Sequence, residues 1–559
     1  MPKSENLSSK NLTLERIRER TKNNFIPFAE KVGRRKEKTP QTVLCLSGGG
    51  LKGAFEVGAL YYLTKHWREL NIVGVLGTST GAINALTIAA KKDKAAELLA
   101  DSYLEAKNTS SFFMETSEYH AFKMQLAAAG ITIDLLKMDF DLPRELKELN
   151  NKDYPKQIRG LIDVLTILSF LTSKGETLTD AISKLNRVKG VINANPAFSR
   201  IEAKIAKDLE DGHLLPLRMY MVQYDDGDLY YMDESGHVFQ DTSGQEVKYA
   251  LGGRKDELIE GAKASSAIPF FFEPRRFERT GKGGVDYFID GGVRETMPLK
   301  GAKEMLEQIT GEHPKRIISI VCSLPYVSPM AKAPNPFSVV MRTLSVFQSE
   351  SLINEIAPSN GFNDSIERVN IFSETPVISD ASSLDLDRGS IRILMDDGYM
   401  SAWEAMNLKD PAEIEDDNEK NRVNAILENR KAITELRKKI WLKEKSINWK
   451  APAIGPIPGA PDPSWRPNKD FIISVRKHKH ELLELLETRV QKTGGDLSCL
   501  PEIKVNGKVV STFKHWYTMF EHHTPDALVA HSLWSKSYPF TGTLKLTELS
   551  SKPIASWDK

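Results

Sequence analysis

The sequence has few cysteines and almost no net charge. Its 559 residues contain three cysteines, Cys45, Cys322 and Cys499, which lie far apart in the chain. Such sparse thiols argue against a disulfide framework and favour a reducing compartment, with Cys45 and Cys322 expected to be buried thiols in apolar strands. The 76 basic and 75 acidic residues give a formal net charge of +1. This balance implies no general attraction to nucleic acid.

The sequence also lacks a segment that would target or anchor the chain. Residues 1–40 are polar and basic and contain no apolar core of the kind found in a secretory signal. The most apolar run, residues 160–171, is shorter than the about 20 residues that cross a bilayer. These absences predict a protein that is cytoplasmic or peripherally bound to a membrane. The length predicts more than one domain and a sizeable core.

Two glycine-rich turns are the most informative feature of the sequence. The first follows the apolar run 42–46 and reads Ser-Gly-Gly-Gly-Leu-Lys-Gly over residues 47–53. The second follows the apolar run 72–76 and reads Gly-Thr-Ser-Thr-Gly over residues 77–81. Each turn therefore lies between a predicted strand and a predicted helix, which is the context in which such motifs carry chemistry.

The second turn has the form of a nucleophile elbow. Gly77 and Gly81 lack the Cβ atoms that would clash where a strand turns directly into a helix, and Ser79 lies between them on a strained turn. Its position at a helix N-terminus favours negative charge that develops nearby. The pattern predicts that Ser79 is a nucleophile.

The first turn is suited to hold an oxyanion. Gly48, Gly49 and Gly50 let backbone amides converge on one oxygen atom, and Lys52, followed by Gly53, adds positive potential. A loop that binds nucleotide phosphate is the alternative for glycines after a strand. That alternative is disfavoured because neither the Gly-Lys-Ser/Thr pattern nor the dinucleotide-binding pattern fits these residues.

A third motif, Asp290-Gly291-Gly292, follows the predicted strand 286–289. The small-residue segment 264–271, which contains a proline, precedes that strand. In this order the motifs resemble the patatin-like phospholipases, a family of lipid acyl hydrolases with an oxyanion glycine loop, a Gly-x-Ser-x-Gly and an Asp-Gly-Gly/Ala. The resemblance covers residues 41–408 and implies that Asp290 is the second catalytic residue.

One position departs from the family pattern. The family often has an asparagine two residues before the proline that follows Asp-Gly-Gly, whereas this chain has Thr296 before Met297-Pro298. A threonine can still donate and accept hydrogen bonds. We interpret the difference as a changed neighbour of the site, with activity retained.

The residue types predict a mechanism for ester hydrolysis. Ser79 would attack the acyl carbonyl, Asp290 would take its proton, and the glycine amides would hold the oxyanion; water would then release the fatty acid from an acyl-enzyme. An aspartate is a weak base at its reference pKa of about 3.9, and burial would raise that pKa. The mechanism requires no metal and no other cofactor.

A Ser-His-Asp triad is the alternative mechanism. In the chain order of an α/β-hydrolase its histidine would follow Asp290. His313 lies in a turn-like Gly-Glu-His-Pro string, and His515, His522 and His523 lie beyond a predicted linker. The Ser-Asp dyad is therefore favoured.

Strands that alternate with helices predict an α/β fold with three layers, a patatin-like fold whose central sheet is mainly parallel. The site should then lie beyond the C-terminal ends of the strands. Further strands are expected at 217–223, 229–232, 316–324 and 368–372, and a helix at 256–264. The acidic turn 225–228 lacks the spacing of a calcium-binding loop and is interpreted as a simple connection.

The remaining segments predict accessory regions. Residues 1–40 form a basic arm that is either solvated or in contact with an anionic membrane. Residues 101–215 form a helical insertion or lid, in which run 160–171 is either a buried helix that faces the active-site cleft or an interfacial lid element. In the same insertion, Phe112, Phe113, Met114, Phe122 and Met124 either line an acyl pocket or pack in the core. Four segments complete this division of the chain: the catalytic domain 41–408, a charged helical segment 409–450 that is exposed or coiled, a proline-rich linker 451–467 and an aromatic-rich C-terminal accessory region 468–559.

The sequence thus predicts a serine acyl hydrolase of the phospholipase A or lipase type. Its expected substrate is a phospholipid or another acyl lipid at a membrane surface. One alternative is an esterase or thioesterase that acts on soluble acyl substrates. Another is a membrane-binding module with a latent hydrolase core, which a protein activator would switch on through the C-terminal region.

Overall fold

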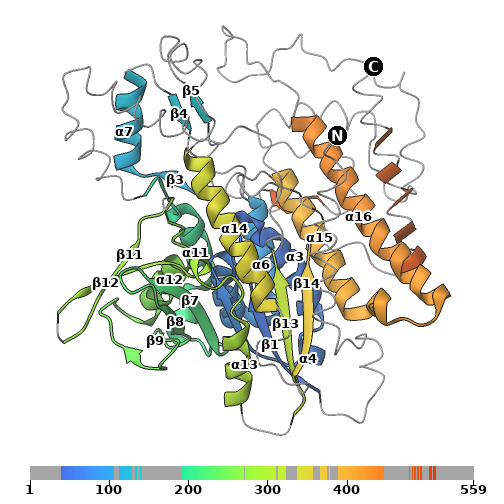
Figure 1. The fold of residues 1–559 in the computed structure, drawn as a ribbon, viewed down its shortest axis with the longest axis horizontal. Helices are drawn as coiled ribbons and strands as arrows, with labels where there is room; N and C mark the ends of the chain where they lie inside the picture. Colours follow the sequence, from blue (N-terminus) through green and yellow to red (C-terminus); the bar gives the residue numbers. More distant parts are fainter. Residues whose placement is uncertain are drawn as a thin grey trace.

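Figure 1 shows the fold of the chain in a computed structural model. The structure describes residues 39–105, 112–128, 132–134, 139–141, 190–269, 271–281, 283–309, 313–322, 336–356, 366–373, 375, 377, 388–445, 477–478, 481–482, 484–485, 488–489, 491–493, 503–505 and 508–511. Most of the basic arm, the apolar run 160–171, the proline-rich linker and the aromatic tail predicted above lie outside these residues.

The centre of the molecule is a ten-stranded sheet whose main path runs in the order β10-β9-β8-β7-β2-β1-β13-β14. Five neighbouring strands of this path run parallel, as expected: β7 (Leu217–Gln223), β2 (Ile72–Thr78), β1 (Gln41–Leu46), β13 (Lys315–Val321) and β14 (Ile366–Phe372). Side chains of β1 alternate between two separate apolar cores, with Leu44 and Leu46 on one face and Val43 and Cys45 on the other. A strand buried on both faces needs the apolar run seen in the sequence.

Helices cover both faces of the sheet and give the three expected layers (Figure 1). One face packs against α13 (Leu299–Gln308) and α14 (Pro336–Ile356). The other face packs against α3 (Gly53–Lys65), α5 (Thr80–Lys91), α6 (Ala95–Glu105), α11 (Asn195–Asp211), α12 (Arg254–Ser265) and α15 (Arg388–Asn407). Helix α11 is the last helix of the expected insertion, and its side chains Phe198, Ile201 and Ile205 are part of this core.

The far side of the sheet is antiparallel. The strands β8 (Leu229–Asp233), β9 (Val238–Gln240) and β10 (Glu246–Val247) continue from β7 as a meander, and the acidic turn 225–228 joins β7 to β8 as expected. A hairpin of β11 (Arg275–Glu278) and β12 (Val285–Asp290) also joins the sheet.

The pairing of β12 determines where the site forms. β2 pairs with residues 217–220 of β7, whereas β12 pairs antiparallel with residues 221–223 of the same strand. The opposite edge of β7 is occupied by β8. β2 and β12 therefore lie end to end along one edge of β7, and their C-terminal residues, Thr78 and Asp290, meet.

Smaller elements complete the described chain. These are α4 (Trp67–Leu70), β3 (Met114–Glu115), α7 (Ser117–Ala128), β4 (Thr132–Asp134), β5 (Asp139–Asp141), β6 (Ile192–Asn193), α16 (Asp417–Lys445), β15 (Ile503–Val505) and β16 (Lys508–Ser511), with short 3-10 turns at Gly50–Lys52, Lys92–Lys94, Gly291–Val293 and Pro411–Glu413. Cys45 and Cys322 are buried and not bonded to each other, as predicted. Within the described ranges, no helix combines the length and the apolarity needed to cross a membrane.

Helices α3 and α15 cross in direct backbone contact. A Cβ atom on Gly58 of α3 would lie 1.8 Å from the carbonyl oxygen of Met395, and one on Gly398 of α15 would lie 2.0 Å from that of Phe55. Only glycine allows this approach. The helix that follows the first glycine-rich turn is thereby packed tightly against a helix near the end of the catalytic domain.

The charged segment 409–450 contains helix α16, which is not exposed on every face. Helix α16 runs beside α15, and Val423, Ile426 and Ile433 are buried. Arg430 and Arg437 are also buried, because carboxylates of α15 lie opposite them.

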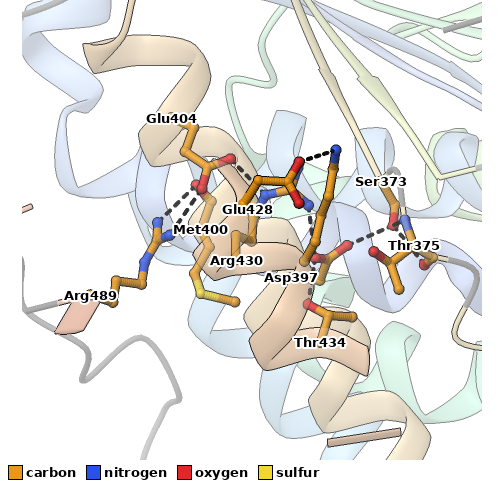
Figure 2. Close-up of polar contacts among 10 residues, drawn as sticks. Ser373, Thr375, Asp397, Met400, Glu404, Glu428, Arg430, Thr434 and Arg489 are labelled. Carbon is orange, nitrogen blue, oxygen red and sulfur yellow. Dashed lines mark hydrogen bonds and ion pairs between the residues drawn. The ribbon is translucent and has the colours of Figure 1, made fainter. Parts of the chain in front are cut away.

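Figure 2 shows the resulting network of buried charges. Arg430 donates from Nε to Glu404 Oε2 over 2.6 Å and from Nη1 to Asp397 Oδ1 over 3.1 Å. The other oxygen of Glu404 accepts a hydrogen bond of 2.9 Å from Arg489, which lies in the expected accessory region. Asp397 also accepts hydrogen bonds from the hydroxyls of Thr434 and Ser373. The charges are therefore paired inside the protein.

Candidate active site

Ser79 lies at the junction of β2 and α5, on a strained turn. Its φ is 56° and its ψ is −126°, a conformation that non-glycine residues rarely adopt. A Cβ atom on Gly77 would lie 2.3 Å from the carbonyl oxygen of Gly81, and one on Gly81 would lie 2.6 Å from that of Leu46. Both flanking glycines are thus required by close backbone approach, as expected for a nucleophile elbow.

Asp290 accepts a hydrogen bond from this serine. The distance from Ser79 Oγ to Asp290 Oδ2 is 2.6 Å, and the two residues are only 4% and 2% exposed. Asp290 Oδ1 accepts a second hydrogen bond, 2.7 Å long, from the amide of Gly292. Burial raises the pKa of Asp290 to about 7, although both hydrogen bonds oppose the rise. Gly291 must remain small because a Cβ atom there would lie 2.4 Å from the carbonyl oxygen of Tyr220.

The small-residue segment before β12 holds both residues in place. Ser265 Oγ accepts a hydrogen bond of 3.0 Å from the amide of Ser79 and itself donates to the carbonyl oxygen of Tyr220. Two residues later, the carbonyl oxygen of Ala267 accepts the amide of Asp290 over 3.0 Å. The sequence places Ser265 in a small-residue segment but indicates no role for it. The only indication in the sequence was that the segment 264–271 resembles the corresponding segment of the family.

The glycine loop lies directly beside Ser79, and its amides are not equivalent. A Cβ atom on Gly48 would lie 3.2 Å from that of Ser79. The amide of Gly48 donates to the carbonyl oxygen of Thr296 over 3.1 Å, so this donor already has an acceptor within the protein. Gly50 has a φ of 60° and lines the cavity next to Ser79. Gly49 lies between them.

Two further residues of the predicted motif are buried at the start of α3. Lys52 is 7% exposed. A Cβ atom on Gly53 would lie 2.8 Å from both Thr80 Cγ2 and Tyr103 Oη, so this glycine lets α3 approach the helix that follows Ser79. Within the described chain, no cluster of three or more His, Cys, Asp or Glu side chains could hold a metal ion.

A buried carboxyl that sequence analysis missed connects the helices behind the two glycine-rich turns. Glu56 of α3 accepts a hydrogen bond of 2.8 Å from Asn84 of α5, and both side chains are fully buried. Burial raises the pKa of Glu56 to about 8. In the sequence, Glu56 is an acidic residue within an apolar helix, and nothing nearby indicates that Asn84 is its partner.

Thr296, the departure from the family pattern, acts through its backbone. Its side chain is fully buried, and its hydroxyl has no hydrogen-bond partner among the described residues. The amide of Thr296 donates to Glu355 of α14, and its carbonyl oxygen accepts the amide of Gly48. The hydroxyl therefore does not supply the hydrogen bonds that the sequence suggested.

An apolar cavity opens at Ser79. The space in it that can hold the centre of a water molecule is about 60 Å³, and aromatic and aliphatic side chains form most of its wall. Phe112 and Phe113 line it and also belong to the apolar core on this face of the sheet, whereas Met114 and Met124 are exposed. A more polar cavity adjoins it and shares Phe198 and Phe272 as part of its wall.

Histidine does not contribute to the lining of the cavity at Ser79. His313 is exposed just before β13. The other candidates for a triad, His515, His522 and His523, lie outside the described residues.

Comparison with known proteins connects this geometry to a family. Residues 44–303 match the family model described as patatin-like phospholipase. No curated protein sequence matches the chain. VipD from Legionella pneumophila is similar with 13% identity and a TM-score of 0.22, and the match covers 93% of this chain and 89% of VipD. Human GIVD cytosolic phospholipase A2 is similar with 10% identity and a TM-score of 0.25, and the match covers 61% of this chain and 52% of that chain. ExoU in its complex with SpcU from Pseudomonas aeruginosa is similar with 11% identity and a TM-score of 0.21, and the match covers 94% of this chain and 90% of that chain.

These TM-scores are low, so the assignment depends on the family model and on the residues that it covers. The matched segment contains the glycine loop, the nucleophile elbow and the Asp-Gly-Gly motif. It supports a lipid acyl hydrolase activity. Residues 44–303 of this chain thus match the patatin-like phospholipase family.

Proposed function

We propose that the chain is a serine acyl hydrolase that cleaves fatty acyl esters of lipids through a Ser79–Asp290 dyad. The observation that carries the proposal is the 2.6 Å hydrogen bond from Ser79 Oγ to a buried carboxylate, next to an apolar cavity. The strained turn at Ser79 and the hydrogen bond from its amide to Ser265 Oγ support the proposal, because both fix Ser79 in one orientation.

In the first half of the reaction, Ser79 Oγ attacks the acyl carbonyl carbon and its proton passes to Asp290. The carbonyl oxygen becomes an oxyanion, for which we assign the amides of Gly49 and Gly50 as donors, since the amide of Gly48 is already bonded to Thr296. The bond to the alcohol then breaks, and Asp290 returns the proton to the leaving oxygen.

In the second half, water attacks the acyl-enzyme and gives a proton to Asp290. The bond from the acyl carbon to Ser79 Oγ breaks, the fatty acid leaves, and the proton returns to Ser79. A pKa of about 7 suits this exchange, because the carboxylate is basic enough to accept a proton and still ionised in a large fraction of molecules near neutral pH.

The cavity supports an apolar acyl chain as the group that is recognised. It leads from Gly50 and Ser79 between α5, α6 and α11. A long-chain lipid at a membrane surface fits this lining better than a short soluble ester, because burial of each additional methylene contributes about 0.8 kcal/mol. An esterase for soluble substrates and a module that needs a protein activator remain the competing functions.

The test is hydrolysis by the purified full chain of vesicles of phosphatidylcholine and phosphatidylglycerol and of a short-chain ester. Ser79→Ala and Asp290→Asn should each reduce turnover by at least about 1000-fold. Asp225→Asn, in the exposed turn between β7 and β8, is the matched control and should leave turnover unchanged.

The other outcomes each reject part of the proposal. High activity of Asp290→Asn would reject the dyad and require a histidine base. Activity that does not rise when the substrate changes from monomer to micelle would favour the soluble esterase. A wild-type chain that is inactive alone, but active after a partner is added, would favour the regulated module.

A further inference from the structure

The loop between Asp290 and α13 is held by a carboxylate on a distant helix. Glu355 Oε1 accepts the amide of Thr296 over 3.0 Å, and Oε2 accepts the amide of Met297 over 2.6 Å. The hydroxyl of Ser351, one helical turn earlier on α14, also donates to Oε1. Three donors therefore fix this carboxylate, and through it the loop, in one orientation.

The same loop holds the glycine loop on its opposite side. The carbonyl oxygen of Thr296 and the amide of Met297 belong to one peptide group, which is planar and points them in opposite directions. The amide donates to Glu355, while the carbonyl oxygen accepts the amide of Gly48. A line of hydrogen bonds thus runs from Glu355 through one peptide group to the residue that packs against Ser79. Such chains of hydrogen bonds polarise and strengthen one another.

The loop is also rigidly connected to the proposed base. Asp290 begins it, and the carbonyl oxygen of Gly291 accepts the amides of both Arg294 and Glu295. A displacement at Thr296 would therefore move the glycine loop and disturb the turn that carries Asp290. Glu355 itself contacts neither Ser79 nor the cavity.

We propose that Glu355 is a positioning residue for the reaction: by fixing the peptide between Thr296 and Met297, it sets the place of the glycine loop and of Asp290 relative to Ser79. This inference rests on the proposed function of the same site. A positioning role predicts a selective change in turnover when Glu355 is altered. A purely structural role predicts a change in stability without such a change in turnover.

The first test compares Glu355→Gln with the wild type. The amide side chain keeps the size but replaces one accepting oxygen with an NH₂ group that faces a backbone donor. We expect kcat to fall by about 10- to 100-fold with KM within about twofold, because a displacement of about 1 Å can cost about 100-fold in rate. Burial raises the pKa of Glu355 to about 7, so the assays are run well above pH 7, where the carboxylate is ionised.

The matched control is Glu350→Gln, an exposed residue of the same helix, which should leave kcat and KM unchanged. A second readout is the rate at which a fluorophosphonate probe labels Ser79, since this reaction uses the oxyanion donors but no lipid surface. Labelling of Glu355→Gln should slow in proportion to kcat. Ser351→Ala, which removes one donor to Glu355, should lower kcat by a smaller factor and provides the test if Glu355→Gln does not fold.

The inference is overturned if a folded Glu355→Gln keeps the wild-type kcat, or if only KM changes. It is also overturned if Glu355→Gln does not fold and Ser351→Ala keeps the wild-type kcat and labelling rate. Failure of the proposed function has a different signature. In that case the wild-type chain itself would hydrolyse no ester above the level of Ser79→Ala, and the probe would not label Ser79.

Discussion

Replacing Arg430 with methionine should destabilise the chain strongly. Arg430, Asp397 and Glu404 are 3%, 0% and 5% exposed, so the change leaves buried carboxylates without their main cation. Loss of one partner of a buried ion pair typically costs about 3–5 kcal/mol. Arg489 would still bind Glu404, and two hydroxyls would still bind Asp397. We therefore expect a loss of about 3 kcal/mol, the lower end of that range.

The measurement is the free energy of unfolding in urea, followed by circular dichroism of the full chain. Arg422→Met is the matched control, because Arg422 lies on the same helix and also binds a glutamate, Glu419, but the two are 49% and 43% exposed. An exposed pair contributes about 0–1 kcal/mol. Equal losses for the two variants, or a loss below about 1 kcal/mol for Arg430→Met, would refute the conclusion that α16 is docked through desolvated charge.

Two predictions concern pH. Asp290 must be ionised to accept the proton of Ser79. The value of kcat/KM for a short-chain ester should therefore rise with pH, with a midpoint near the Asp290 pKa of about 7, and then level off. A midpoint near pH 4 would contradict the conclusion that burial raises this pKa. Burial raises the pKa of Glu56 from its ordinary value of 4.5 to about 8 in the folded chain. Between pH 4.5 and pH 8, Glu56 is therefore protonated in the folded chain and ionised in the unfolded chain. The contribution of this group to the free energy of unfolding should then fall as the pH rises, by up to about 1.4 kcal/mol per pH unit. Glu56→Gln removes this dependence, so its stability relative to wild type in urea should increase from pH 5 to pH 8, and a constant difference would contradict the prediction.

Local patterns predicted the residues of the candidate site and the layers of the fold. Gly77, Ser79 and Gly81 are recognisable because a strand that turns directly into a helix restricts residues that are close in sequence. The parallel strands could be predicted for a similar reason, since strands buried on both faces are continuously apolar. The contact between Ser79 and Asp290 followed from the order of the motifs in the family.

The supporting groups could not be predicted because their partners are far away in the chain. Ser265 and Glu355 accept hydrogen bonds from backbone amides of distant segments. Every residue except proline has such an amide, so the residue types do not indicate these contacts. The end-to-end meeting of β2 and β12 depends on register with β7, which no local pattern encodes. The buried charges of α16 could not be predicted for the same reason, because Arg430 looks the same in the sequence whether water or a distant carboxylate faces it.

The position of β13 has a consequence for how the chain folds during synthesis. The segment that matches the family ends at residue 303, yet β1 pairs along its whole length with residues 315–320 of β13. A nascent chain that ends before β13 would expose β1 as an apolar edge strand with unpaired backbone groups, which is a template for aggregation. The matched segment therefore lacks one of the two strands that pair with β1. β1 can pair on this edge only after residues 315–320 have been synthesised.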